Sequence, residues 1–282
     1  MLRRSILQAF ALMPVAALMP VADSPTILDY ATRIRVPLYP AQRFALKLSY
    51  GLELDDVPGA IRVHHPLSNT VMESLSEREY LDYLQRKGGA SIRPDGEPAI
   101  VIADFGRRSG STTLSVCIAG FELSKMLSLP KANRTGVLRS RHVTFIGTDK
   151  DQAKLAKAAM SSQAPWRLED TLAQPESDTI GGWKFPNNSQ IRFKSSHSKG
   201  LIGCMSVITD FGTFLEKDAS RIVQWLYRSA RKSDFKAFFL GKNGSVCLRR
   251  LRPSMSFRIP SWDMNPVLDE KTMREHPAEY CV

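Results

Sequence analysis

Residues 99–129 place a short glycine-containing loop between two apolar segments, and this order constrains the fold more than any other feature of the sequence. The run AIVIADF (99–105) is typical of a buried strand, and a helical apolar pattern runs from Thr112 to about Leu129. The loop between them, GRRSGSTT (106–113), would direct backbone N–H groups and a helix N-terminus at one spot, which suits a phosphate. Gly110 would let the backbone approach a ligand closely, and the Thr112 hydroxyl is placed to reach a Mg²⁺ ion.

The full phosphate-loop fingerprint, G-x-x-x-x-G-K-[ST], is not met. Phe105 stands where the first Gly belongs, and Ser111 stands where the Lys belongs. An ordinary strand-to-helix turn therefore stays open beside the phosphate loop.

Composition indicates a folded globular protein with a polyanionic partner. The 282 residues are 43% hydrophobic and 24% charged, and 39 Lys and Arg against 28 Asp and Glu give a net charge of +11. Nucleic acid is the leading candidate for that partner. The four cysteines are scattered without metal-ligand spacing, so we expect reduced thiols in a cytosolic protein, with no zinc site and no disulfide framework.

The first 22 residues imitate a secretory signal, with a basic start followed by an apolar run. They also repeat ALMPVA, and Pro14 and Pro20 would break any helix long enough to span a bilayer. We expect an N-terminal arm over residues 1–26 and a single domain over residues 27–282. A cleaved signal stays open as the alternative.

A proline-rich turn at residues 36–43 is expected to lead into a helix over residues 44–50. This would place Tyr39 and Gln42 just ahead of the helix, where an aromatic face and a carboxamide suit an adenine. The alternative is a turn in which Tyr39 simply packs. Residues 51–65 are expected to form a loop with His64 and His65 on the surface, followed by a helix over residues 75–86.

The rest of the chain alternates strands with helices. Strands are expected at 142–147, 190–194, 203–210, 235–240 and 255–259, and helices at 149–160, with Thr148 as N-cap, and at 219–230. We expect His197 to be an exposed loop residue. The alternation predicts a three-layer α/β fold with a mostly parallel central sheet, in which the strand ends at Phe105 and Asp210 meet on one edge.

With these segments in order, the chain resembles the ATPase domain of the large terminase subunit of tailed bacteriophages, the motor that packages DNA into procapsids. The resemblance covers most of the chain from about Ile27, and it rests on YPAQR (39–43), GRRSG (106–110), VTFIGTDKDQA (143–153), SKGLIG (198–203) and IPSWDMNP (259–266). It implies a P-loop NTPase fold of the additional-strand, RecA-like type, with ATP and Mg²⁺ as cofactors. It also implies double-stranded DNA, a small terminase subunit and a portal protein as partners, a homo-oligomeric ring, no membrane association, and action in the host cell cytoplasm.

Carried over residue by residue, the resemblance gives Gln42 the adenine contact, Arg107 the catalytic loop arginine, and Asp210 an acidic catalytic and metal-binding role. Thr112 would share the metal. The cofactor-binding residues expected on this basis are Tyr39, Gln42, Gly106, Arg107, Arg108, Ser109, Gly110, Ser111, Thr112 and Thr113.

The departures from the family lie in the chemistry. Ser111 replaces the phosphate-binding Lys, and the Asp-Glu pair expected near Asp210 has lost one carboxylate, with Thr209 in its place or with one residue missing. The Ser/Thr-rich coupling motif expected after the strand at 235–240 is replaced by GKNG (241–244). Because phosphoryl transfer depends on positioning and electrostatics, we expect ATP binding with weak or absent turnover.

Two other hypotheses stay open. One is a non-catalytic, basic DNA-binding or assembly module that keeps the fold, and the other is an exported protein with an incidental P-loop likeness. The family's chain would also continue into a nuclease domain, whereas this sequence stops at Val282, so we expect no DNA cleavage from it.

Overall fold

The computed structural model describes residues 25–65, 68, 70–92, 99–106, 108–129, 141–162, 175–179, 181–198, 205–229, 235–242 and 253–268. Most of the expected N-terminal arm (1–26) and part of the connection after residue 129 lie outside the described residues. Arg107 of the loop lies outside them as well. The proposed domain boundary stays a prediction.

The described chain forms helices α1 to α7 and strands β1 to β11. The helices are α1 (Ile27–Arg33), α2 (Pro40–Tyr50), α3 (Glu77–Arg86), α4 (Ser111–Leu127), α5 (Lys150–Ser162), α6 (Glu216–Ser229) and α7 (Ser261–Met264), with a short 3₁₀ turn at Phe211–Thr213. The strands are β1 (Ile61–His64), β2 (Val71–Leu75), β3 (Ala90–Ile92), β4 (Ile100–Phe105), β5 (His142–Gly147), β6 (Ser177–Thr179), β7 (Gly182–Lys184), β8 (Gln190–Ser195), β9 (Met205–Thr209), β10 (Lys236–Gly241) and β11 (Met255–Ile259).

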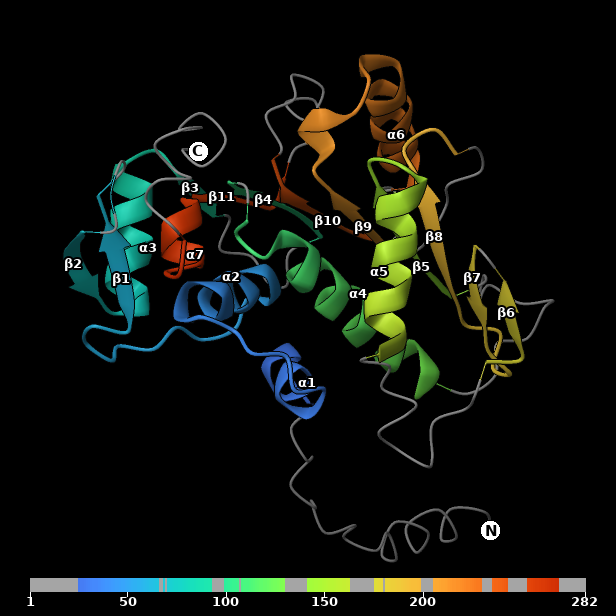
Figure 1. Cartoon of the computed structure of the whole chain (residues 1–282), viewed down its shortest axis with the longest axis horizontal. Helices are drawn as coiled ribbons and strands as arrows, with labels where there is room; N and C mark the ends of the chain where they lie inside the picture. The colour runs from blue at the N-terminus through green and yellow to red at the C-terminus, as the bar shows by residue number, and fades with distance from the viewer. Residues whose placement is uncertain are drawn as a thin grey trace, which may run out of the picture.

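The centre of the fold is a nine-stranded sheet in the order β3-β11-β4-β10-β9-β5-β8-β7-β6 (Figure 1). Neighbouring strands from β11 to β8 run parallel, while β3 on one edge and the β7–β6 hairpin on the other are antiparallel. Strand β10 lies between the loop strand β4 and the strand β9 that precedes Asp210. The predicted mixed α/β fold with a mostly parallel sheet and an additional strand is therefore confirmed.

Alternating side chains of the central strands divide into two cores, one on each face of the sheet. Val207 of β9 and Phe238 of β10 belong to the core shared with α1, α2 and α4. Their neighbours Ile208 and Phe239 pack on the other face against α6. This makes the three layers that the sequence predicts, and Figure 1 shows α4 and α5 in front of the strands.

Helix α4 is apolar on nearly every side because it is packed between the sheet and the N-terminal helices. Gly120 allows this approach, since a Cβ there would lie 2.2 Å from the Tyr30 hydroxyl of α1. Burial raises the pKa of the nearby Cys117 thiol to about 12. Cys117 is therefore a buried free thiol of the core with little tendency to ionise.

The prediction that residues 51–65 form a loop with His64 on the surface is wrong. Residues Ile61–His64 form strand β1, paired antiparallel with β2. The His64 backbone N–H and ring Nδ1 both lie 3.0 Å from Asp263 Oδ1, and the Tyr80 hydroxyl donates to Asp263 Oδ2 at 2.7 Å. All three side chains are buried. The short strand was missed because its burial depends on α3 and α7, which come later in the chain.

Among the described residues, no helix combines the length and the apolar character needed to cross a membrane.

Candidate nucleotide site

The predicted phosphate loop lies between β4 and α4. Strand β4 ends at Phe105, helix α4 begins at Ser111, and Gly110 is its N-cap in the left-handed region with φ 86°. Arg108 is also left-handed, with φ 59°. Two such residues within three positions turn the chain sharply from the sheet edge into the helix.

Asp210 follows β9 at the same edge of the sheet as this loop. Because β4 and β9 both pair in parallel with β10, the carboxyl ends of these three strands lie at the same edge of the sheet. The prediction that Phe105 and Asp210 close near-neighbouring parallel strands is confirmed. Asp210 takes a left-handed conformation with φ 50°, which is more common for Asp than for most residues.

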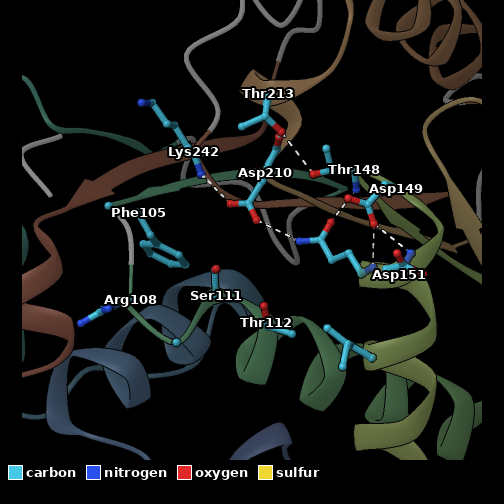
Figure 2. A pocket seen from close by; sticks show the side chains of 14 residues that line it. Phe105, Arg108, Ser111, Thr112, Thr148, Asp149, Asp151, Asp210, Thr213 and Lys242 are labelled. Atoms are coloured by element: carbon cyan, nitrogen blue, oxygen red, sulfur yellow. Dashed lines mark hydrogen bonds between the residues drawn. The ribbon is translucent and has the colours of Figure 1, made fainter. Parts of the chain in front are cut away.

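A cavity of about 860 Å³ opens between the loop and Asp210. Its volume falls within the range of small-molecule sites, roughly 300–1,000 Å³. In Figure 2, Ser111 and Thr112 lie on one wall, and Asp210, Thr148 and Thr213 lie on the opposite wall. The lining residues are Phe105, Gly106, Arg108, Gly110, Ser111, Thr112, Thr148, Asp149, Asp151, Gln152, Leu155, Asp210, Thr213 and Lys242.

The structure brings part of the predicted site together. Of the predicted residues, those that line the cavity are Gly106, Arg108, Gly110, Ser111, Thr112 and Asp210. The predicted residues that the structure places outside the cavity lining are Tyr39, Gln42, Ser109 and Thr113. The catalytic role expected of Arg107 stays a prediction.

The Asp210 carboxylate is held by two donors. Oδ2 accepts from Gln152 Nε2 at 3.1 Å, and Oδ1 accepts from the Lys242 backbone N–H at 3.2 Å. Gly241 makes room for it, because a Cβ at that position would lie 2.2 Å from Oδ1. The first residues of the GKNG segment therefore shape the acidic wall of the cavity.

The wall beside Asp210 comes from the start of helix α5. Asp149 Oδ1 accepts from the backbone N–H groups of Asp151 and Gln152, each at 2.8 Å, so Asp149 caps the helix. The prediction of Thr148 as N-cap is wrong by one residue, because Asp149 and not Thr148 stands immediately before the first helical residue. The Thr148 N–H instead donates to Gln152 Oε1, which orients the carboxamide toward Asp210.

Gln42 lies inside the first turn of α2, because the helix begins at Pro40 and not at residue 44. Proline at the first helical position suits a helix start, so the predicted turn over residues 36–43 is wrong from Pro40 onward. The side chain is 5% exposed, Oε1 accepts from the Tyr39 N–H at 3.0 Å, and Nε2 donates to Ser109 O at 2.9 Å. Its hydrogen bonds are thus with the backbone of Tyr39 and of the loop, and the adenine contact stays a prediction.

Thr209, one candidate for the lost acidic position, does not line the cavity. It is the last residue of β9, fully buried, and its hydroxyl lies 3.4 Å from Ile146 O. Asp210 is therefore the carboxylate that this segment contributes.

His197 is 56% exposed at its side chain and lies outside the cavity, as expected. Its Nδ1 is 2.6 Å from Asp218 Oδ2, and Arg221 binds the other oxygen of the same carboxylate at 2.9 Å. Arg221 also donates to Ser196 O at 2.7 Å. This cluster fastens the β8–β9 connection to α6.

Several lining residues were not predicted from the sequence. Thr148, Gln152 and Lys242 all follow strands β5 or β10, which neighbour β9 in the sheet. Their positions just after buried strands were a usable signal, since the carboxyl ends of parallel strands gather ligand contacts. The exposed Lys242 is, with Arg108, one of the two cationic residues among the described lining.

The cavity fits a Mg²⁺-bound phosphate better than an all-protein metal site. The described residues contain no group of three or more His, Cys, Asp or Glu side chains suited to a metal. Mg²⁺ at nucleotide sites usually takes one or two protein oxygens and completes its shell with phosphates and water. Thr112 and Asp210, both in the lining, are of the type that such an ion uses.

No family model matches the sequence, and no curated protein matches it. Among solved structures, the fold is similar to the large terminase ATPase domain of Thermus phage P74-26 at 15% identity and a TM-score of 0.45, over 66% of this chain and 90% of that one. A point mutant of that domain aligns over 64% and 83%, with the same identity and TM-score. The HK97 bacteriophage large terminase also aligns at 15% identity and a TM-score of 0.45, over 66% of this chain but 43% of its own length.

Proposed function

We propose that this chain binds ATP and Mg²⁺ in the cavity at the sheet edge, as a terminase-type ATPase domain that packages viral double-stranded DNA into procapsids. The observation that carries the proposal is the convergence of Gly110, Thr112 and Asp210 on one cavity, although Asp210 is far from the others in the sequence. An incidental strand-to-helix turn would not need to face a carboxylate that follows β9, a strand separated from β4 by β10.

The chain's own groups suit a triphosphate. The first turn of α4 leaves N–H groups without helical carbonyl partners, and these attract phosphate oxygens. Thr112 and Asp210 would hold the Mg²⁺ ion, which when bound neutralises part of the phosphate charge. Arg108 and Lys242 add positive charge to the lining.

Hydrolysis is expected to be poor. Ser111 offers a neutral hydroxyl where the family has a full positive charge, and Thr209 is buried beside the single carboxylate Asp210. Both Asp210 oxygens already accept hydrogen bonds, from Gln152 and from the Lys242 backbone. We therefore propose a site that binds ATP and positions the attacking water badly.

The alternative is a non-catalytic DNA-binding or assembly module that retains the fold. The same missing charges favour it, together with the net charge of +11. On either proposal DNA is contacted mainly through its phosphates, so binding should weaken steeply as salt rises. The partners proposed from the resemblance are a small terminase subunit, a portal protein and further copies of this chain in a ring, in the host cytoplasm.

Calorimetric titration with ATP and Mg²⁺, followed by hydrolysis assays with and without duplex DNA, tests the proposal. We expect saturable ATP binding with turnover that is weak and rises little with DNA. Robust DNA-stimulated hydrolysis would contradict the degraded site. Absence of ATP binding together with salt-sensitive DNA binding would leave the non-catalytic module as the function.

A further inference from the structure

Two consecutive carbonyls of the phosphate loop are each held by a side-chain carboxamide. Asn265 Nδ2 donates to Arg108 O at 3.0 Å, and Gln42 Nε2 donates to Ser109 O at 2.9 Å. The two carboxamides come from opposite ends of the described chain, one just after α7 and the other in α2. Nothing local in the loop sequence brings them there.

Holding these carbonyls also fixes the direction of two N–H groups. The described peptide bonds are all trans, so each N–H points opposite to the C=O of the same peptide unit. The carbonyls of Arg108 and Ser109 share their peptide units with the N–H groups of Ser109 and Gly110. Gly110 lines the cavity and Gln42 does not, so the Gly110 N–H points away from the Gln42 carboxamide and toward the cavity side. The Ser109 N–H belongs to a fully buried residue outside the lining, so the Asn265 bond acts instead on the left-handed backbone of Arg108, which does line the cavity.

We infer that Asn265 is a positioning residue of the phosphate site, which holds the Arg108 backbone at the cavity while Gln42 aims the Gly110 N–H at a bound phosphate. This inference rests on the proposed function. It also explains how a loop without the usual Lys retains affinity, because fixed N–H dipoles need no reorganisation when an anion arrives.

The Asn265 carboxamide is itself well oriented. Its Oδ1 accepts from the Val267 N–H at 3.3 Å, which leaves Nδ2 as the group that faces Arg108 O. Its backbone N–H donates to Ser261 O at 2.8 Å. The preceding helix α7 is anchored by Asp263 in the buried network with His64 and Tyr80.

The second carboxamide requires a glycine beside it. A Cβ on Gly110 would lie 2.5 Å from Gln42 Nε2, and the φ of 86° would strain any other residue. Gly110 is thus needed for the contact with Gln42 as well as for the approach of a ligand. Gln42 here acts on the loop backbone, a role distinct from the adenine contact that the resemblance implies.

The test compares Asn265→Ala with Asn187→Ala. Asn187 is a matched control, because its carboxamide binds carbonyls at the C-terminal end of α4, whereas Asn265 binds the loop at the N-terminal end. Asn187 Nδ2 donates to Met126 O at 3.0 Å and to Leu127 O at 3.3 Å, in the last turn of α4. Both variants and the wild type are titrated with ATP plus Mg²⁺ and with inorganic triphosphate, which carries no base. Thermal melts report the stability of each protein.

We expect Asn265→Ala to lower the affinity for both ligands by at least about tenfold, and Asn187→Ala to lower neither affinity by more than about twofold. Both variants should be less stable than the wild type. Unchanged affinity in Asn265→Ala, or an equal loss in Asn187→Ala, would overturn the inference and leave the proposed function intact. Failure of the wild type to bind either ligand would overturn both.

Gln42→Ala provides a second test that does not depend on the folding of Asn265→Ala. We expect Gln42→Ala to lower the affinity for inorganic triphosphate and for ATP by the same factor, because it disturbs the phosphate loop and not a base contact. A loss confined to ATP would identify a base contact and contradict the positioning role.

Discussion

The two ends of helix α4 are both held by side-chain carboxamides, but the bonds have different consequences. At the C-terminal end, Asn187 donates to the carbonyls of Met126 and Leu127 in the last turn, where Met126 O also accepts from the Leu129 N–H. At the N-terminal end, Asn265 and Gln42 bond carbonyls that precede the helix, in the loop beside the cavity. The first arrangement ties down the last turn of the helix, and the second positions the loop that precedes the helix.

On the inference above, the same kind of hydrogen bond serves stability at one end of the helix and ligand binding at the other. The C-terminal contact joins α4 to the β7–β8 turn, whereas the N-terminal contacts bring together α2 and the segment after α7. Both ends of the helix are therefore held by residues that are distant in the sequence.

The largest effect is expected from Asp263→Ala, which removes the anchor behind Asn265. Tyr80 and His64 would lose their buried partner, and leaving buried polar groups unpaired costs about 1–3 kcal/mol each, so we expect a loss of about 3 kcal/mol. Urea denaturation measures this loss. Tyr80→Phe removes only one donor and should cost about 1 kcal/mol. Equal, small effects in both variants would contradict the anchoring role.

The next effect is expected from alanine at the two glycines of this helix region. Gly110→Ala forces a left-handed Ala against Gln42, at a cost of roughly 1–2 kcal/mol. Gly120→Ala overpacks the contact with Tyr30, at a cost of about 1–3 kcal/mol. We expect ATP affinity to fall at least about tenfold in the first and to stay unchanged in the second. Retained affinity in Gly110→Ala would remove the distinction between the two ends.

Lysine at each end of the helix gives a third test. Ser111→Lys restores the charge that the loop lacks, and we expect ATP to bind at least about tenfold more tightly, or about 1.4 kcal/mol. Hydrolysis should stay poor because Thr209 and Asp210 still supply one carboxylate. Ser128→Lys, at the exposed C-cap, should only stabilise the helix, by about 0.3–1 kcal/mol, through attraction between the Lys charge and the helix dipole. No gain in affinity for Ser111→Lys by calorimetry would mean that the loop is not a phosphate site.

The smallest effect is expected from the two threonines of the first turn. Thr112 lines the cavity and Thr113 does not. Thr112→Val should weaken the binding of ATP with Mg²⁺ by about 1 kcal/mol, the net contribution of a typical hydrogen bond. It should not change the binding of inorganic triphosphate without Mg²⁺. Thr113→Val should change neither titration. Equal losses for the two ligands would rule out a metal contact by Thr112.

Sequence reasoning succeeded where a pattern is local and strong. Strands β5 and β11 have the predicted ends, and strands β4, β9 and β10 were placed within two residues, because buried parallel strands form continuous apolar runs. The meeting of Phe105 and Asp210 followed from topology alone. The predicted start of helix α2, at residue 44, is four residues too late because Pro40 indicates a turn in sequence. Proline is nevertheless well suited to a first helical position.

The parts that sequence reasoning missed depend on contacts between distant residues. His64 is buried because Asp263, far along the chain, supplies its partner. The Asn265 contact with the loop is equally remote, and an Asn before a Pro predicts only a turn. Asp210 was found as a strand-end carboxylate, whereas the donors that hold it, Gln152 and Lys242, follow two other strands.

The most direct test of the central claim is to record amide ¹⁵N–¹H spectra of the protein while it is titrated with ATP and Mg²⁺. The account predicts that the largest shifts fall on the N–H groups of Gly110 and Ser111, with little change at Met126 and Leu127. The same loop signals should shift with inorganic triphosphate. Saturable ATP binding that leaves these loop signals unmoved, or shifts concentrated at the far end of α4, would contradict it.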